Sequence, residues 1–180
     1  MRKYNTIVID FPWPVGKGGN TITFGGARLQ KTLPYKEMSY DDIKQYPIND
    51  YAAEESSLFL WVTHTTLPFG LELVKSWGFK YHCLLTWDKT NGLCIRGIHR
   101  KTENIIFAYR GRMTIKQKGK AIPTLFTEKL TKHSAKPDIF YSIIQENTLE
   151  PRVDIFARKR HFGFDAVGDQ VEPLVQETLN

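Results

Sequence analysis

The 180-residue sequence has only two cysteines, no long apolar run and no repeated segment. Cys83 and Cys94 lie eleven positions apart without a nearby histidine pair. This spacing argues against both a disulfide framework and a zinc site, and free thiols are typical of a reducing compartment. The apolar runs are too short for a membrane-spanning helix or the core of a signal peptide. The sequence therefore predicts a cytoplasmic protein with no membrane association.

The composition is that of an ordinary globular protein with a modest basic excess. Hydrophobic residues make up 41% and charged residues 24% of the chain, and the net charge is +6. This length predicts a single domain over residues 1–180. The positive charge is compatible with a polyanionic partner such as nucleic acid, although many basic proteins only expose a solvated positive face.

Apolar β-branched runs alternate with helical patterns along the chain. We expect strands at 6–9, 57–63, 79–87, 103–109 and 152–157, and helices at 39–46, 67–77 and 137–145. Because several of these strands are continuously apolar, they predict a mostly parallel sheet with helices on both faces, an α/β fold. Ligands of such sheets bind beyond the carboxyl ends of the strands.

Two segments lack periodicity and are predicted to be mobile active-site or substrate loops. Residues 14–34 are rich in glycine, a composition that suits a disordered linker equally well. Residues 110–136 are rich in lysine and arginine. These and nearby basic residues could contact the phosphate backbone of a nucleic acid, which is the functional interpretation. The alternative interpretation is a solvated basic loop without such a role. The basic residues are Arg96, Arg100, Lys101, Arg110, Arg112, Lys116, Lys118, Lys120, Lys129 and Lys132.

The most informative residues are Asp10, Phe11, Pro12 and Trp13, which follow the first predicted strand. This pattern suits a pocket for a flat nitrogen heterocycle. The Asp10 carboxylate would accept a hydrogen bond from an exocyclic amino group, and a backbone carbonyl of Phe11-Pro12 would add a second acceptor. Trp13 would stack on the ring. An exposed aspartate with an ordinary pKa near ~3.9 suffices, because it need not act as a strong base.

Several motifs, in order, resemble the MT-A70-type S-adenosylmethionine-dependent methyltransferases, which modify the N6 amino group of adenine. The first motif, Asp10-Phe11-Pro12-Trp13, is similar to the family's Asp-Pro-Pro-Trp. The others are Tyr35 to Ser39, Leu58 to Thr63, Ser76 to Tyr81, Trp87 to Asn91, His133 to Asp138, Asp154 to Arg158 and Gly168 to Gln170. The resemblance spans nearly the whole chain. It implies a Rossmann-like methyltransferase fold and a substrate of adenine-containing DNA or RNA.

The resemblance also implies roles for individual residues. The catalytic residues would be Asp10, Phe11, Pro12 and Trp13. The cofactor, S-adenosyl-L-methionine, would be bound by Ile9, Asp10, Lys136, Phe156, Arg158, Asp169 and Gln170. The substrate would be bound by Trp13, Tyr35, Glu103 and Lys136. His133 suits a structural role and a functional role equally.

Plainer roles exist for several of these residues. Asp10 suits a turn acid, Trp13 a partly buried core aromatic, Glu103 a charge at a strand edge and Lys136 a solvated surface lysine. Two alternatives to adenine-N6 methylation also remain. Because Phe11 replaces the family's first proline, the chain also suits a non-catalytic nucleic-acid-binding subunit of a methyltransferase heterodimer. Methylation of the N4 amino group of cytosine would use the same chemistry.

Overall fold

The computed structural model describes residues 2–14, 21–24, 27–30, 37–95, 97–116, 121–129 and 135–168. Contacts within the chain divide it into two compact units. The first takes in Met1–Asp10 and Ile48–Asn180, and the second is Phe11–Pro47. The organisation as one domain stays a prediction.

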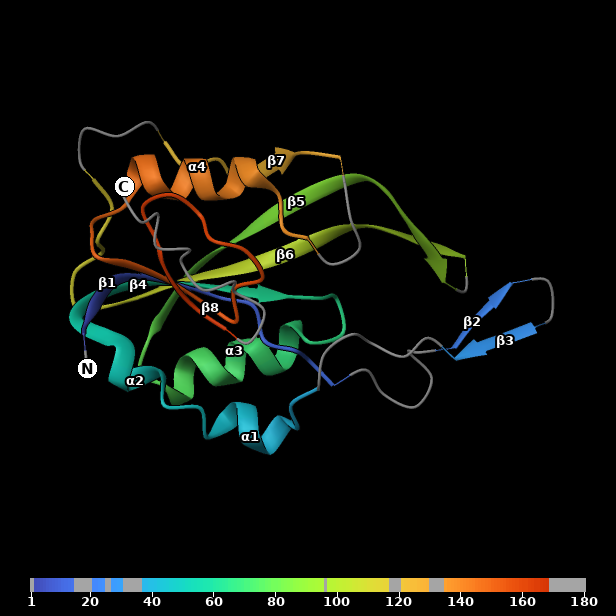
Figure 1. The fold of residues 1–180 in the computed structure, drawn as a ribbon, viewed down its shortest axis with the longest axis horizontal. Helices are drawn as coiled ribbons and strands as arrows, with labels where there is room; N and C mark the ends of the chain where they lie inside the picture. The colour runs from blue at the N-terminus through green and yellow to red at the C-terminus, as the bar shows by residue number, and fades with distance from the viewer. Residues whose placement is uncertain are drawn as a thin grey trace, which may run out of the picture. The chain divides into compact units, whose positions relative to one another are not determined.

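A seven-stranded sheet forms the centre of the first unit (Figure 1). Its strands are β1 (Tyr4–Ile9), β4 (Ala52–Val62), β5 (Lys80–Ile95), β6 (Ile98–Arg110), β7 (Leu125–Thr127), β8 (Arg152–Ile155) and β9 (Asp165–Val167). They lie in the order β7-β5-β6-β4-β1-β8-β9. Among these described strands, β6 alone runs antiparallel to its neighbours, and the other pairings are parallel. The prediction of a mostly parallel α/β sheet, as in a Rossmann-like methyltransferase fold, is confirmed.

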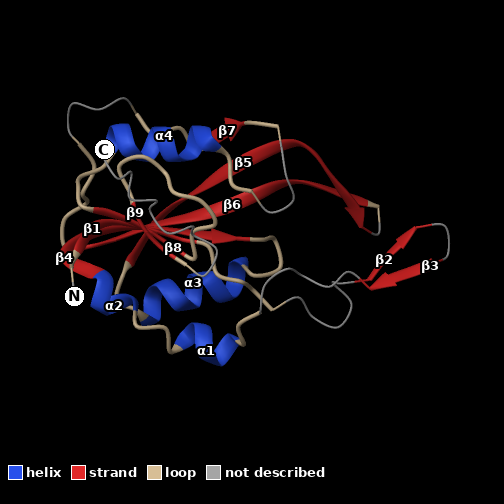
Figure 2. Cartoon of the chain, in the orientation of Figure 1, coloured by secondary structure: helices blue, strands red, loops and turns tan. Residues whose placement is uncertain are grey.

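Helices α3 (Leu67–Ser76) and α4 (Asp138–Asn147) lie on opposite faces of this sheet (Figure 2). α2 (Ile48–Tyr51) is a short helix leading into β4. α3 approaches its face closely at Gly70, where a Cβ atom would lie 2.8 Å from a methyl group of Val62 and 2.9 Å from one of Ile106. Helices on both faces were predicted, and this is confirmed. Among the described helices, none has the length and apolar character that a membrane crossing requires.

α4 belongs to a hydrophobic cluster that is rich in aromatic side chains. Phe140 of α4 packs edge-on against Phe59 and Trp61 of β4, with ring centroids 6.1 and 5.0 Å apart. The first turn of α4 is capped by Glu128, whose carboxylate accepts hydrogen bonds from the backbone N–H groups of Asp138 and Ile139, each at 3.0 Å. This cap, rather than a residue of the helix itself, fixes the N-terminus of α4.

The second unit contains α1 (Tyr40–Lys44) and the antiparallel pair β2 (Thr21–Phe24) and β3 (Ala27–Gln30). α1 begins as predicted, because Oγ of Ser39 accepts a hydrogen bond from the backbone N–H of Asp42 at 3.1 Å.

Five short elements were not predicted from the sequence. The segments 14–34 and 110–136, expected to be loops, contain the strand pair β2–β3 and the strand β7, respectively. β9 lies after the last predicted strand, and α2 precedes a predicted strand. Three of these elements span four residues and the other strands only three, too few for a periodic pattern.

Candidate active site

Asp10 follows β1 directly, at the edge of the sheet where the parallel strands have their carboxyl ends. Its backbone N–H donates to the carbonyl oxygen of Ile155 at the end of β8, at 3.3 Å. This bond extends the ladder of β1 by one residue and fixes the point from which the side chain projects. The side chain is only 13% exposed, so the expectation of an exposed aspartate is wrong.

Lys136, two residues before α4, lies between two carboxylates. Its Nζ is 3.3 Å from Oδ1 of Asp10 and 3.0 Å from Oε2 of Glu103. The same ammonium group lies 4.6 Å from the ring centre of Trp61, a cation–π contact. With 14% of its side chain exposed, Lys136 is not a solvated surface lysine.

Glu103 reaches this edge because β6 is antiparallel. The first half of β6 therefore lies beside the carboxyl ends of its neighbours, and Glu103 stands opposite Trp87 of β5. Its Oε2 faces Lys136, and its Oε1 accepts a hydrogen bond from Nζ of Lys89 at 3.2 Å. Glu103 thus bridges two ammonium groups.

The pKa shifts follow from burial and from this charge arrangement. Burial raises the pKa of Asp10 above its usual range, although Lys136 and Arg158 act in the opposite direction, so the expected ordinary value is wrong. Burial also disfavours the ionised form of Glu103, but Lys136 and Lys89 outweigh it and lower the pKa of Glu103 to about 2. Burial works against the charge of Lys136 as well, yet the two carboxylates raise its pKa. The arrangement therefore favours the charged forms of Glu103 and Lys136, whereas burial disfavours that of Asp10.

A second buried carboxylate, that of Asp154, lies in β8. Asp154 pairs with Val8 of β1, which lies two residues before Asp10 in the sequence. Its side chain accepts a hydrogen bond from Tyr141 of α4. Its Oδ2 is buried and has no hydrogen-bond partner among the described residues. Burial raises the pKa of Asp154 to about 7, and the charge of Asp10 adds to this effect.

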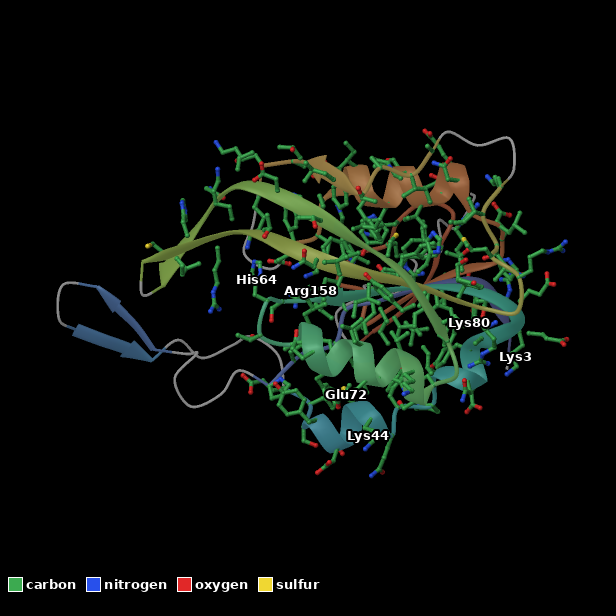
Figure 3. All side chains as sticks on the ribbon, turned by 180° about the vertical axis from the view of Figure 1, so that it is seen from behind. Lys3, Lys44, His64, Glu72, Lys80 and Arg158 are labelled. Carbon is green, nitrogen blue, oxygen red and sulfur yellow. The ribbon has the colours of Figure 1, made fainter. Side chains whose placement is uncertain are left out.

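The segment after β8 brings a cation and an unusual backbone conformation to this edge. Arg158 is half-buried, and its charge acts on Asp10. Arg158 and Lys80, at the start of β5, lie toward opposite ends of the sheet (Figure 3). Phe156 has a φ of 62°, a left-handed conformation that is strained in a non-glycine residue and is found most often near functional sites. Ile9, the last residue of β1, has a fully buried side chain.

Phe11, Pro12 and Trp13 belong to the second unit. Phe11 packs edge-on against both Trp13 and Tyr46, with centroids 5.5 and 5.4 Å apart. Trp13 is 8% exposed, so the aromatic residue is buried in this structure. The carbonyl of Pro12 accepts a hydrogen bond from the backbone N–H of Met38 at 2.9 Å, which leaves one of its two lone pairs. The roles of Pro12 and Trp13 toward a base stay predictions.

Part of the predicted basic segment lies away from Asp10. Arg110 ends β6 opposite Ser56, toward the amino ends of the parallel strands, and donates to the carbonyl oxygen of Trp77. Arg112 pairs with Glu55. These two arginines are therefore at the end of the sheet opposite Asp10 and do not line its surroundings. Tyr35, His133, Asp169 and Gln170, predicted to be site residues or candidates, lie outside the described residues.

The sequence interpretation missed four residues of this cluster: Trp61, Lys89, Tyr141 and Asp154. One signal was available. Asp154 is a charged residue inside the apolar run from Val153 to Ala157, and a buried charge there needs a partner or a function. Lys89 has polar neighbours and so carries no such signal of burial, although it lies in the segment Trp87 to Asn91 that resembles the family. Among the described residues, no group of three histidine, cysteine or acidic side chains is placed to hold a metal ion.

Comparison with known proteins assigns the chain to a family. The sequence profile of the MT-A70 family matches residues 4–170. The chain is 27% identical to a putative N(6)-adenosine-methyltransferase MT-A70-like protein of Medicago truncatula over 99% of its own length, and 24% identical to the human N(6)-adenosine-methyltransferase catalytic subunit METTL3 over 97%. It spans 28% and 29% of the length of these two relatives. Since the profile covers nearly the whole sequence, the chain belongs to the MT-A70 family.

Proposed function

We propose that the chain is an S-adenosylmethionine-dependent methyltransferase that modifies the N6 amino group of adenine in nucleic acid. The observation that carries this proposal is the carboxylate of Asp10, placed at the carboxyl edge of the sheet and contacted by Lys136. Family membership supports it, since relatives at 24–27% identity are named N(6)-adenosine-methyltransferases.

The chemistry requires an acceptor for amino protons. The lone pair of an adenine amino group is delocalised into the ring, so the nitrogen is a poor nucleophile. A hydrogen bond accepted by Asp10 draws the amino group toward a tetrahedral form with a localised lone pair. Lys136 stabilises the ionised acceptor, and Glu103 holds Lys136 on its other side. Most of the rate enhancement then comes from positioning and fixed charges.

The residues at this edge fit the proposed cofactor. S-adenosylmethionine, when bound, supplies a methyl group on a positively charged sulfonium and also carries an ammonium group, a carboxylate and ribose hydroxyls. The buried Oδ2 of Asp154 has no partner among the described residues and suits a polar or cationic group. Arg158 suits the ribose or the carboxylate, and the left-handed turn at Phe156 offers backbone groups.

The polymer and the assembly belong to this proposal too. Adenine in a duplex is stacked, so the base must be presented from a single strand or flipped out of the helix. Human METTL3 is named a catalytic subunit, which supports assembly of this chain with a second copy or with a different partner.

The test is methyl transfer by the purified chain to single- and double-stranded DNA and RNA, followed by nucleoside analysis of the digested product. N6-methyladenine is the expected product, and its presence in one polymer identifies the substrate. N4-methylcytosine in its place would change the substrate base. A chain that neither transfers a methyl group nor binds S-adenosylmethionine in a titration would support the non-catalytic subunit.

A further inference from the structure

Lys89 is a lysine of the candidate site to which neither the sequence pattern nor the family comparison assigns a role. It lies in β5, with 15% of its side chain exposed, and its Nζ is 3.2 Å from Oε1 of Glu103. The other oxygen of Glu103, Oε2, lies 3.0 Å from Lys136. Lys89 has no direct contact with Asp10 in the structure, so any influence on that residue passes through Glu103.

The backbone around Lys89 is irregular. The register between β5 and β6 shifts between Asp88 and Leu93, and Thr90 has a φ of 63°. A left-handed conformation is unfavourable for a β-branched residue, and here the side chain of Asp88 supports it by accepting a hydrogen bond from the backbone N–H of Thr90 at 2.8 Å. Such bulges redirect side chains and are frequent beside active sites.

We propose that Lys89 is a positioning residue that, through Glu103, keeps the ammonium group of Lys136 on Asp10. This inference rests on the proposed function, in which the Asp10 carboxylate accepts a hydrogen bond from the substrate amino group. The contact with Lys136 favours the ionised carboxylate that does so. Lys89 binds one oxygen of Glu103, turns the other toward Lys136 and neutralises part of the charge of Glu103. Without Lys89, Glu103 competes more strongly for Lys136, and Asp10 loses part of its counter-charge.

The competition is decided by charge at short distance. Lys136 is nearer to Glu103 than to Asp10, at 3.0 Å against 3.3 Å. Both carboxylates are largely removed from solvent. In such surroundings Coulomb energies are several times larger than in water. Besides Lys136 and Glu103, the charge of Arg158 lowers the pKa of Asp10. The charge of Asp10 in turn raises the pKa values of Asp154 and Tyr141.

The test is the titration of the Asp10 carboxyl carbon by NMR, assigned with Asp10→Asn. Lys89→Met keeps the aliphatic stem and removes the charge, and we expect the pKa of Asp10 to rise by about one unit, a tenfold change in proton affinity. Lys89→Arg keeps the charge and should leave the pKa near its wild-type value. Lys80→Met, at the far end of the same strand, is the control for net charge.

A double variant tests the route through Glu103. Glu103→Gln frees Lys136 for Asp10, so the pKa of Asp10 should fall, opposite to the effect of Lys89→Met. In the Glu103→Gln background, Lys89→Met should leave it nearly unchanged. An unshifted Asp10 titration in Lys89→Met, or equal shifts with and without Glu103, would overturn the proposal. Lys89→Gln gives the same comparison if Lys89→Met does not fold.

The titration separates this inference from the proposed function, because it needs no activity. A wild-type chain that transfers no methyl group would contradict the function and leave the coupling measurable. In an active chain, we expect the acid limb of the pH–kcat profile of Lys89→Met to move upward with the pKa of Asp10, while KM stays nearly the same. A packing role for Lys89 would leave the profile in place.

Discussion

Nζ of Lys136 lies 3.3 Å from Oδ1 of Asp10, and this contact joins the end of the first strand to the segment before the last helix. The two residues are far apart in sequence, and the parallel sheet brings them together. Lys136 is also held by Glu103 and by the ring of Trp61, so Asp10 receives only a share of its charge. Burial therefore still raises the pKa of Asp10 against the effect of Lys136, whereas Lys136 and Lys89 lower the pKa of Glu103 to about 2.

Asp10→Ala should abolish methyl transfer while leaving the fold intact. The variant removes the acceptor for the amino group, and loss of one such positioned group costs on the order of 100-fold or more in rate. Asp10→Asn keeps an acceptor oxygen without charge and should retain more activity. The measurement is the rate of N6-methyladenine formation together with the melting temperature. Asp50→Ala, at an exposed position of α2, is the control. Activity near the wild-type level in Asp10→Ala would contradict the proposed role.

Lys136→Met should destabilise the fold. It leaves Asp10 and Glu103 at a largely buried edge without their shared counter-ion, and loss of one partner from a buried ion pair costs about 3 kcal/mol. Urea unfolding at pH 7 measures this loss. Adding Glu103→Gln should restore part of the stability, since one uncompensated charge is then removed. Lys75→Met, on the exposed side of α3, should have little effect. Equal stability of wild type and Lys136→Met would show that the ion pairs of Lys136 make no net contribution to the free energy of unfolding.

The motif Asp10 to Trp13 and the entry to α4 could be read from the sequence, because each is a local pattern. The sequence predicts that Lys136 and Glu103 belong to one site, but it does not predict their ion pair. That contact depends on the antiparallel direction of β6. The sequence gives no periodic signal for an antiparallel strand within a parallel sheet. The burial of Trp13 could not be settled from the sequence, because its pattern does not reveal the packing of Phe11 against it.

The pH dependence of stability should have an acid limb that depends on Glu103. Its pKa falls from 4.5 to about 2 on folding. The folded state therefore binds this proton less tightly than the unfolded state, and the resulting stabilisation is present above about pH 4.5 and lost as the pH falls toward 2. Unfolding free energies of wild type and Glu103→Gln, measured between pH 2 and 6, should converge at the acid end. A difference that stays constant with pH would contradict this assignment.

Asp154 should affect the pH dependence of stability in the direction opposite to Glu103. Its pKa rises from 3.8 to about 7 on folding, so the folded state binds this proton more tightly and stability falls as the pH rises across that interval. Asp154→Asn removes the titration, so its stability relative to wild type should grow by up to about 4 kcal/mol between pH 4 and 8. Asp50→Asn, at an exposed position, should show no such trend. A relative stability that does not change with pH would exclude a protonated Asp154 in the folded state.

Gly70→Ala tests the packing of α3 independently of the site. A Cβ atom at this position would lie 2.8 Å from Cγ1 of Val62 and 2.9 Å from Cδ1 of Ile106, closer than real contacts allow. Alanine has the higher helix propensity, by about 1 kcal/mol. Overpacking costs about 1–3 kcal/mol, so the net effect should be a loss of stability. Thermal unfolding of Gly70→Ala and of Lys75→Ala, an exposed position of the same helix, separates the two contributions. Stabilisation of Gly70→Ala would mean that α3 stands farther from Val62 and Ile106 than the structure places it.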